Sequence, residues 1–142
     1  MAEKMTPEEQ RAFLSAGTRT AKLATVGADG RPHVAPIWFV LDGDTVIFTT
    51  GESTVKGRNL RRDPRVALSV DDETPPFAFV LIEGTAEPAA DAPEMLEWAT
   101  RIAARYMGAA RADAYGRRNA VPGELLVRVR PTKIIAEKGN SN

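Results

Sequence analysis

The residues best suited to chemistry follow Thr45–Thr50, a run with the β-branched and aromatic composition of a strand. Gly51 interrupts the run, and Ser53 has the hydroxyl side chain that is typical of a helix N-cap. With Ser53 as the cap, Lys56 lies at the third helical position. A helix N-terminus already has partial positive charge, so a lysine there is unfavourable unless an anion is bound. Free N–H groups, a hydroxyl and an ammonium at one helix end predict a phosphate-binding site.

The same helix contains further basic residues with different expected roles. Arg58 lies one turn above the cap and is a second candidate for the anion. Gly57 weakens the helix but allows a ligand to approach its backbone closely. Arg61 and Arg62 are expected to be solvated surface charges, as basic residues on helices usually are. Asp63 is expected to pair with one of these two arginines.

Several kinds of catalytic site are excluded by what the sequence lacks. There is no cysteine, and His33 is the one histidine. Disulfides, thiolate chemistry and a metal site with several imidazole ligands are therefore excluded within one chain. The sequence contains no Gly-x-Ser-x-Gly elbow, Walker loop or dinucleotide-binding glycine motif. We assign no catalytic side chain and no metal ligand, so an enzyme of this sequence would depend on a bound cofactor.

Composition predicts one ordinary globular domain spanning residues 1–142. Formal net charge is zero, which gives no overall field to attract nucleic acid or an anionic membrane. Met1–Lys4 has no apolar stretch of the kind found in secretory signals. No apolar run approaches the length of a transmembrane helix. We therefore expect a cytoplasmic protein that binds neither nucleic acid nor membrane.

Hydrophobic patterning predicts mainly strands, joined by short turns and a few helices. Thr6 begins a capping box for a helix to about Ala16, and Asp91 begins another for a helix through about Tyr106. A weaker helical signal covers 109–119. The expected strands are 20–26, 33–41, 45–50, 65–70, 77–86 and 124–135, of which the first three form a meander. These elements predict a mainly β (α+β) fold, a six-stranded antiparallel barrel with short flanking helices.

Two strands have sequence patterns that predict which face is buried. In 65–70, Val66, Leu68 and Val70 alternate on one face. In 124–135, Leu126 lies on one face, and Leu125, Val127 and Val129 lie on the other.

The strand expected over 33–41 contains a second possible ligand contact. Pro36 has no N–H to donate, so it predicts a sheet edge or bulge where neighbouring backbone groups are free to face a ligand. Trp38 either belongs to the core or flanks a planar ring. Phe77, which follows Pro75-Pro76, is either a core residue or a lid or interface aromatic. Tyr106 is expected to pack at the end of its helix.

With these residues in view, the chain resembles the split-barrel flavin-binding proteins related to pyridoxamine 5'-phosphate oxidase. It looks closest to the actinobacterial branch that binds the deazaflavin coenzyme F420. The matching stretches are Thr20–Thr25, Asp29–Phe39 and Thr49–Val70, with looser similarity at Gly84–Ala86, Arg105–Gly108 and the last strand. The resemblance implies an oxidoreductase that passes a hydride from reduced F420 to an unsaturated or conjugated small molecule.

The resemblance also implies a homodimer with its cofactors at the subunit interface. The cofactor ring would lie along the strand with Pro36, Ile37 and Trp38, and Thr49 and Thr50 would lie beside the ribityl chain. The residues implied to hold the phosphate, or to lie near it, are Ser53, Lys56, Gly57, Arg58 and Asn59. Phe77 would reach the ring from the other subunit.

Departures from the family pattern bear on the activity. Oxidases that bind flavin mononucleotide (FMN) have a basic residue for the phosphate where this chain has the uncharged Val34-Ala35. The substrate-binding Arg and His near the C-terminus of true pyridoxamine phosphate oxidases have no counterpart, which argues against vitamin B6 oxidation. Alternatives are an FMN-dependent oxidoreductase of the same fold or a carrier of flavin or deazaflavin without turnover. A nucleic-acid-binding barrel is disfavoured by zero net charge and few aromatic residues.

Overall fold

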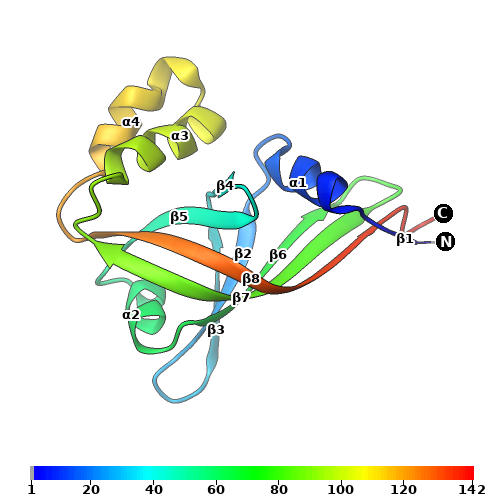
Figure 1. Ribbon diagram of the computed structural model, residues 1–142, viewed down its shortest axis with the longest axis horizontal. Helices are drawn as coiled ribbons and strands as arrows, with labels where there is room; N and C mark the ends of the chain where they lie inside the picture. Colours follow the sequence, from blue (N-terminus) through cyan, green and yellow to red (C-terminus); the bar gives the residue numbers. More distant parts are fainter. Residues whose placement is uncertain (1) are drawn as a thin grey trace.

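The computed structural model describes residues 2–142, and its centre is one sheet in which every strand pair is antiparallel. Hydrogen bonds join the strands in the order β3-β2-β6-β7-β8-β5-β4, and β1 pairs with β8 (Figure 1). The strands are β1 (Glu3–Lys4), β2 (Ala21–Val26), β3 (Pro32–Ile37), β4 (Val40–Asp42), β5 (Thr45–Gly51), β6 (Arg65–Asp72), β7 (Ala78–Ala90) and β8 (Glu124–Lys138).

The helices lie around this curved sheet (Figure 1). They are α1 (Pro7–Ser15), α2 (Val55–Arg62), α3 (Met95–Met107) and α4 (Ala112–Asn119), with the 3-10 turn η1 (Ala109–Arg111) before α4. Helix α2 connects β5 to β6, whereas α3 and α4 form a hairpin between β7 and β8. No described helix is both long enough and apolar enough to span a membrane.

The predicted fold class is confirmed: the chain is a mainly β split barrel with flanking helices. The expected count of six strands is wrong, because the described residues form an 8-stranded sheet. The additional strands are the short β1 and β4. The sheet is also not closed by hydrogen bonds, since β3 and β4 lie at opposite ends of the strand order.

The single strand expected over 33–41 is wrong, and so is the meander of the first three strands. The chain leaves the sheet at Trp38 and Phe39, so β3 pairs with β2 whereas β4 pairs with β5. Pro36 lies in β3 at the end of the strand order, which confirms the predicted edge. A proline is tolerated there because an edge strand need not donate a second set of ladder hydrogen bonds.

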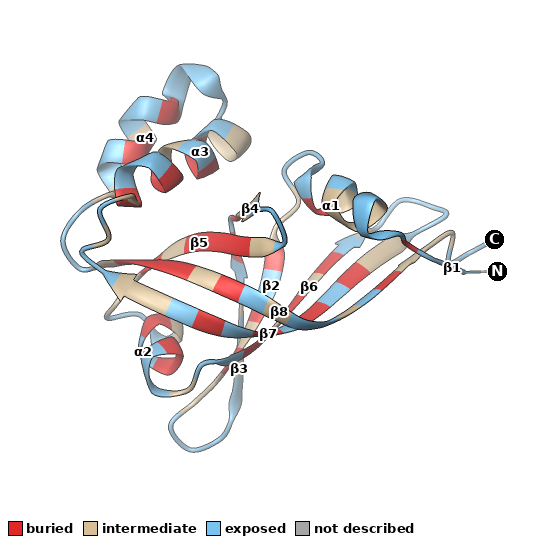
Figure 2. Ribbon diagram, viewed as in Figure 1, coloured by how far each residue is buried: buried red, intermediate tan, exposed pale blue. Residues whose placement is uncertain are grey.

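The main core consists mainly of apolar residues of the sheet, and buried and exposed positions alternate along much of its strands (Figure 2). Val66, Leu68 and Val70 of β6 are all buried, as predicted. Strands β7 and β8 cross this core along most of their length, with a register shift after Glu83. A Cβ on Gly84 would lie 2.6 Å from the Arg130 carbonyl oxygen, so glycine is required where the two backbones approach at the bulge.

The two predicted faces of β8 are buried in different clusters. Leu125, Val127 and Val129 belong to the main core, and Leu126 packs with Ile47, Met95 and Trp98 under α3. The α3–α4 hairpin therefore covers the outer side of β5 and β8 at one end of the sheet. Because β8 is buried on both faces here, its successive residues 125–127 are all apolar.

The helix-start predictions have mixed outcomes. The capping box of α1 is confirmed, because Thr6 and Glu9 exchange hydrogen bonds of 3.0 and 3.1 Å between side chain and backbone N–H. The Asp91 cap is wrong: α3 begins at Met95, and Asp91 has a left-handed φ of 55°. The Met95 N–H bonds the Ala92 carbonyl in a tight turn before the helix, and Glu94 at the N-cap position makes no side-chain cap bond. The helical signal over 109–119 is confirmed by η1 and α4.

Candidate functional site

The start of α2 differs by one residue from the sequence prediction, because Thr54 rather than Ser53 is the N-cap. The Thr54 hydroxyl accepts the Gly57 N–H at 3.0 Å and donates to the Gly51 carbonyl at 2.8 Å. It also lies 3.2 Å from the Thr50 hydroxyl. Thr54 is the better cap because its hydroxyl joins the helix to the end of β5. Lys56 is therefore at the second helical position, not the third.

The changed cap position still leaves donors without partners among the described residues at the start of α2. Within residues 2–142, the backbone N–H groups of Val55 and Lys56 have no hydrogen-bond acceptor. Neither the Lys56 ammonium nor the exposed Ser53 hydroxyl has a hydrogen bond or ion pair in the described structure. Arg58 is exposed, and its guanidinium donates to the Ser53 carbonyl at 2.8 Å. These residues lie in the first turn of α2 or next to it, where the helix dipole favours negative charge.

Gly57 and Asn59 make contacts within the chain. A Cβ on Gly57 would lie 2.2 Å from the Gly51 carbonyl oxygen, so this glycine lets α2 approach β5. The space is filled by the chain itself rather than open to a ligand. Asn59 is buried, and its side chain donates to the Thr25 hydroxyl at 3.0 Å and accepts from Arg62 at 2.7 Å. For both residues, a role in cofactor binding remains a prediction.

The other arginines of this segment are paired. Arg62, expected to be solvated, also donates to the Val26 carbonyl at 3.1 Å and so links α2 to β2. Arg61 lies 3.6 Å from Glu52. Asp63 pairs with Arg65 at 2.7 Å rather than with Arg61 or Arg62. The hydrogen bond from Arg65 lowers the pKa of Asp63 to about 2.

The residues predicted to lie along the cofactor ring and those predicted to lie beside its ribityl chain come from different parts of the sheet. Thr49 and the buried Thr50 lie at the end of β5, directly before the α2 start. Pro36 is exposed on the edge strand, Ile37 is buried in the core, and Trp38 is 40% exposed. Successive side chains from Pro36 to Trp38 therefore alternate between the surface and the core.

Phe77 is not near α2 within one chain. It is exposed, with a φ of 61°, in the loop that joins β6 to β7. This loop lies at the end of the molecule near the termini, opposite to α2 (Figure 1). The backbone of Asn140 bonds the Phe77 carbonyl at 3.2 Å, which ties the loop to the C-terminal segment. A contact between Phe77 and the α2 site therefore requires a second subunit.

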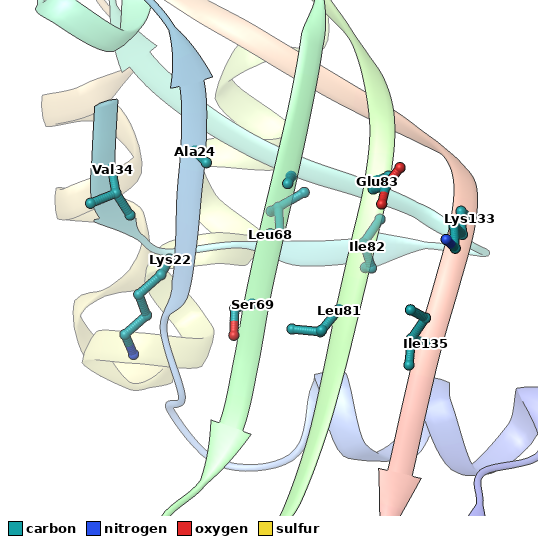
Figure 3. Close-up of a pocket in the computed structure, with 11 residues that line it drawn as sticks. Lys22, Ala24, Val34, Leu68, Ser69, Leu81, Ile82, Glu83, Lys133 and Ile135 are labelled. Carbon is teal, nitrogen blue, oxygen red and sulfur yellow. The ribbon is translucent and has the colours of Figure 1, made fainter. Parts of the chain in front are cut away.

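An apolar groove of about 280 Å³ runs over the outer face of the sheet (Figure 3). Its apolar side chains include Val34, Leu81 and Ile135, which are 66%, 39% and 42% exposed. Small residues on β2 and β6 form its floor, and Lys22, Glu83 and Lys133 contribute charged groups. An exposed apolar face with charged residues beside it is typical of an interaction surface.

Two functional candidates were not found from sequence. The first is Glu124, which pairs with Gly51 at the end of the β5–β8 ladder, beside the α2 start. Burial raises the pKa of the Glu124 carboxyl, and nearby Lys56 partly offsets this effect. The second is the Arg105-Tyr106 pair on α3, which contacts the Trp38–Phe39 break. Both depend on contacts between residues distant in sequence. The Arg105–Gly108 motif resembled the family and Tyr106 was expected to pack, but the sequence did not indicate what this pair contacts.

Comparison with known proteins identifies the family. Residues 6–137 match the pyridoxamine 5'-phosphate oxidase family. The chain belongs to this family. The resemblance inferred from sequence is therefore confirmed.

Individual relatives include two proteins named as reductases. A 5a,11a-dehydrotetracycline/5a,11a-dehydrooxytetracycline reductase of Streptomyces rimosus is 39% identical over 74 residues, 46% of this chain. The match spans about half (52%) of that relative's length. A solved F420 reductase has a TM-score of 0.68 at 28% identity, over 87% of this chain and 94% of its own. The conserved hypothetical protein Rv2991 of Mycobacterium tuberculosis has a TM-score of 0.82 at 28% identity, covering 96% and 87%.

Proposed function

We propose that this chain is an F420-dependent oxidoreductase that passes a hydride from reduced F420 to an unsaturated or conjugated small molecule. The observation that carries the proposal is the start of α2, where two backbone N–H groups, the Ser53 hydroxyl and the Lys56 ammonium lack partners among the described residues. Family membership and the two reductases among the relatives support an oxidoreductase.

The residues present fit the phosphate of a flavin-type cofactor. Unpaired donors at a helix N-terminus suit an anion because they gain hydrogen bonds and the helix dipole is favourable. Ser53 and Lys56 would hold the phosphate directly, and Arg58 would contribute positive charge from the exposed side. Thr54 acts indirectly, since its hydroxyl fixes the helix start against Gly51.

The edge strand would support the ring of the cofactor. Pro36 leaves one position of β3 without an N–H, and the chain leaves the sheet two residues later, at Trp38. Backbone groups near such a break are available for a planar ligand. When bound, reduced F420 supplies the hydride, and the protein contributes position and water exclusion.

A second copy of this chain would complete the site. The groove over β2, β6 and β7 exposes Val34, Leu81 and Ile135, which together favour burial against another apolar surface. The loop between β6 and β7, which contains Phe77, lies at the end of the molecule opposite to α2 (Figure 1). A homodimer built on the groove would bury the apolar face and allow Phe77 to approach the partner's cofactor.

Cofactor titration tests the proposal. The purified protein is titrated separately with F420 and with FMN, and bound cofactor is followed by absorbance and equilibrium dialysis. We expect tighter binding of F420, followed by multiple-turnover reduction of conjugated acceptors by reduced F420. Tight FMN binding without F420 binding would identify the FMN-dependent alternative. Binding without turnover of any acceptor would identify a carrier.

A further inference from the structure

Trp38 lies on an aromatic stack at the break between β3 and β4. Its indole is parallel to the ring of Tyr106, with centroids 4.9 Å apart and an interplanar angle of 5°. This stack covers one indole face, yet Trp38 is still 40% exposed. No other aromatic ring and no cation stacks on Trp38 within residues 2–142. Trp38 therefore has surface left for a further contact.

Tyr106 is held firmly beneath the indole. Its hydroxyl donates to the Arg19 carbonyl at 2.8 Å and accepts the Phe39 N–H at 3.2 Å. Burial raises the pKa of the Tyr106 hydroxyl, so the group remains a hydrogen-bond donor at neutral pH. These bonds connect α3 to the residue that follows Trp38 and to the residues before β2.

Arg105 strengthens the same junction. Its guanidinium donates to the carbonyls of Phe39 and Leu14, each at 2.7 Å, and to that of Gly17 at 3.0 Å. It also lies over the rings of Phe39 and Tyr106, at 4.7 and 4.9 Å from their centroids. A residue that joins three separate segments leaves little freedom for the backbone that precedes and follows Trp38.

We propose that the outer indole face of Trp38 stacks against a planar conjugated ring, and that Tyr106 and Arg105 are positioning residues for this surface. Planar rings stack favourably on aromatic side chains, and a surface already fixed in place loses little entropy when the ligand binds. The inference deepens the proposed function and rests on it, because Trp38 follows the strand along which the cofactor ring is proposed to lie. The ring is either that of the deazaflavin or that of the conjugated acceptor.

Binding measurements separate these two sources. Calorimetric titration with oxidised F420 alone, and with menadione alone as a planar acceptor, gives a Kd for each ligand. Trp38→Leu removes the aromatic face. We expect it to weaken the binding of one ligand, so that its Kd rises by about 10-fold. Trp38→Phe keeps a ring and should restore most of that loss. Trp98→Phe alters the other tryptophan, on the buried face of α3, and should leave both Kd values unchanged.

The positioning role has its own readout. Tyr106→Phe keeps the stacked ring but removes the hydroxyl that bonds Arg19 and Phe39. In the Trp98→Phe background, Trp38 is the remaining tryptophan, so its emission reports directly on the stack. We expect Tyr106→Phe to shift this emission. It should also raise the Kd of the same ligand whose Kd is raised by Trp38→Leu. A fall in thermal stability with unchanged emission and Kd would overturn the positioning role.

Different experimental outcomes would refute this inference and the proposed function. Equal Kd values for wild type and Trp38→Leu with both ligands would overturn the stacking surface and leave F420 binding intact. Loss of F420 binding in wild type would refute the proposed function, and the menadione titration would still test Trp38. Absence of binding by both ligands to wild type would overturn the two proposals together.

Discussion

Lys56 contributes the charge on which the proposed phosphate site depends. Its ammonium makes no hydrogen bond or ion pair within residues 2–142, at a helix end where positive charge is otherwise unfavourable. We expect Lys56→Ala to weaken F420 binding by about 1.5–3 kcal/mol, the value of a hydrogen bond to a charged group. Equilibrium dialysis measures the change.

A control for Lys56 lies on the same helix. Arg61→Ala also removes one positive charge, but Arg61 pairs with Glu52 at 3.6 Å and lies beyond the α2 start. The Arg61→Ala variant should bind F420 with an affinity close to that of wild type. If Lys56→Ala also binds F420 as wild type does, Lys56 is a solvated surface charge and the phosphate site is elsewhere.

Glu124 makes the same site sensitive to pH. Burial raises the pKa of its carboxyl above 4.5, with Lys56 opposing the shift. Because the folded state favours the protonated form, this group's contribution to stability is present below pH 4.5 and is lost as pH rises through the raised pKa. Ionisation over the same interval adds negative charge beside the phosphate-binding groups, so F420 affinity should fall as pH rises.

Glu124→Gln tests this dependence. The variant stays neutral, so its F420 affinity should exceed that of wild type above the raised pKa, and the two affinities should approach each other as pH falls below that pKa. The ratio of the two Kd values is measured over a pH series, which cancels titration of the ligand itself. A ratio that does not change with pH would show that the Glu124 carboxylate does not reach the bound phosphate.

At the scale of elements, the approach of α2 to β5 decides the geometry of the site. Replacing a helical glycine by alanine is ordinarily stabilising by about 0.5–1 kcal/mol. Here the new Cβ of Gly57→Ala would lie 2.2 Å from the Gly51 carbonyl oxygen. We therefore expect destabilisation of about 1–3 kcal/mol, as for an overpacked site. Urea denaturation measures it, with the exposed Arg61→Ala as comparison; a more stable Gly57→Ala protein would refute the close contact.

Local pattern was informative for elements whose stabilising contacts are near in sequence. The Thr6 capping box, the buried face of β6 and the two faces of β8 follow from short-range spacing, and all are confirmed. The Thr54 cap was missed because two adjacent hydroxyl residues both satisfy the pattern. The contact with Gly51 at the end of β5 selects between them.

At the scale of the whole molecule, the apolar groove on the sheet predicts self-association. Leu81→Arg places a charge in the middle of the groove, and we expect it to convert a dimer to a monomer in light-scattering measurements. The matched control is Leu96→Arg, since Leu96 is a 50% exposed leucine on α3, outside the groove. A dimer that survives Leu81→Arg, or a wild-type monomer, would contradict the groove as the interface.

The sequence by itself predicted the mainly β class and a helix start soon after Thr50, because alternation and capping act over a few residues. The family followed from the resemblance of its motifs. Only the tertiary structure decided that β3 and β4 separate at Trp38, that Tyr106 stacks there, and that Glu124 lies beside the α2 start. These features join residues that are tens of positions apart. Their energies come from packing and burial, which depend on how the sheet curves and not on any local pattern.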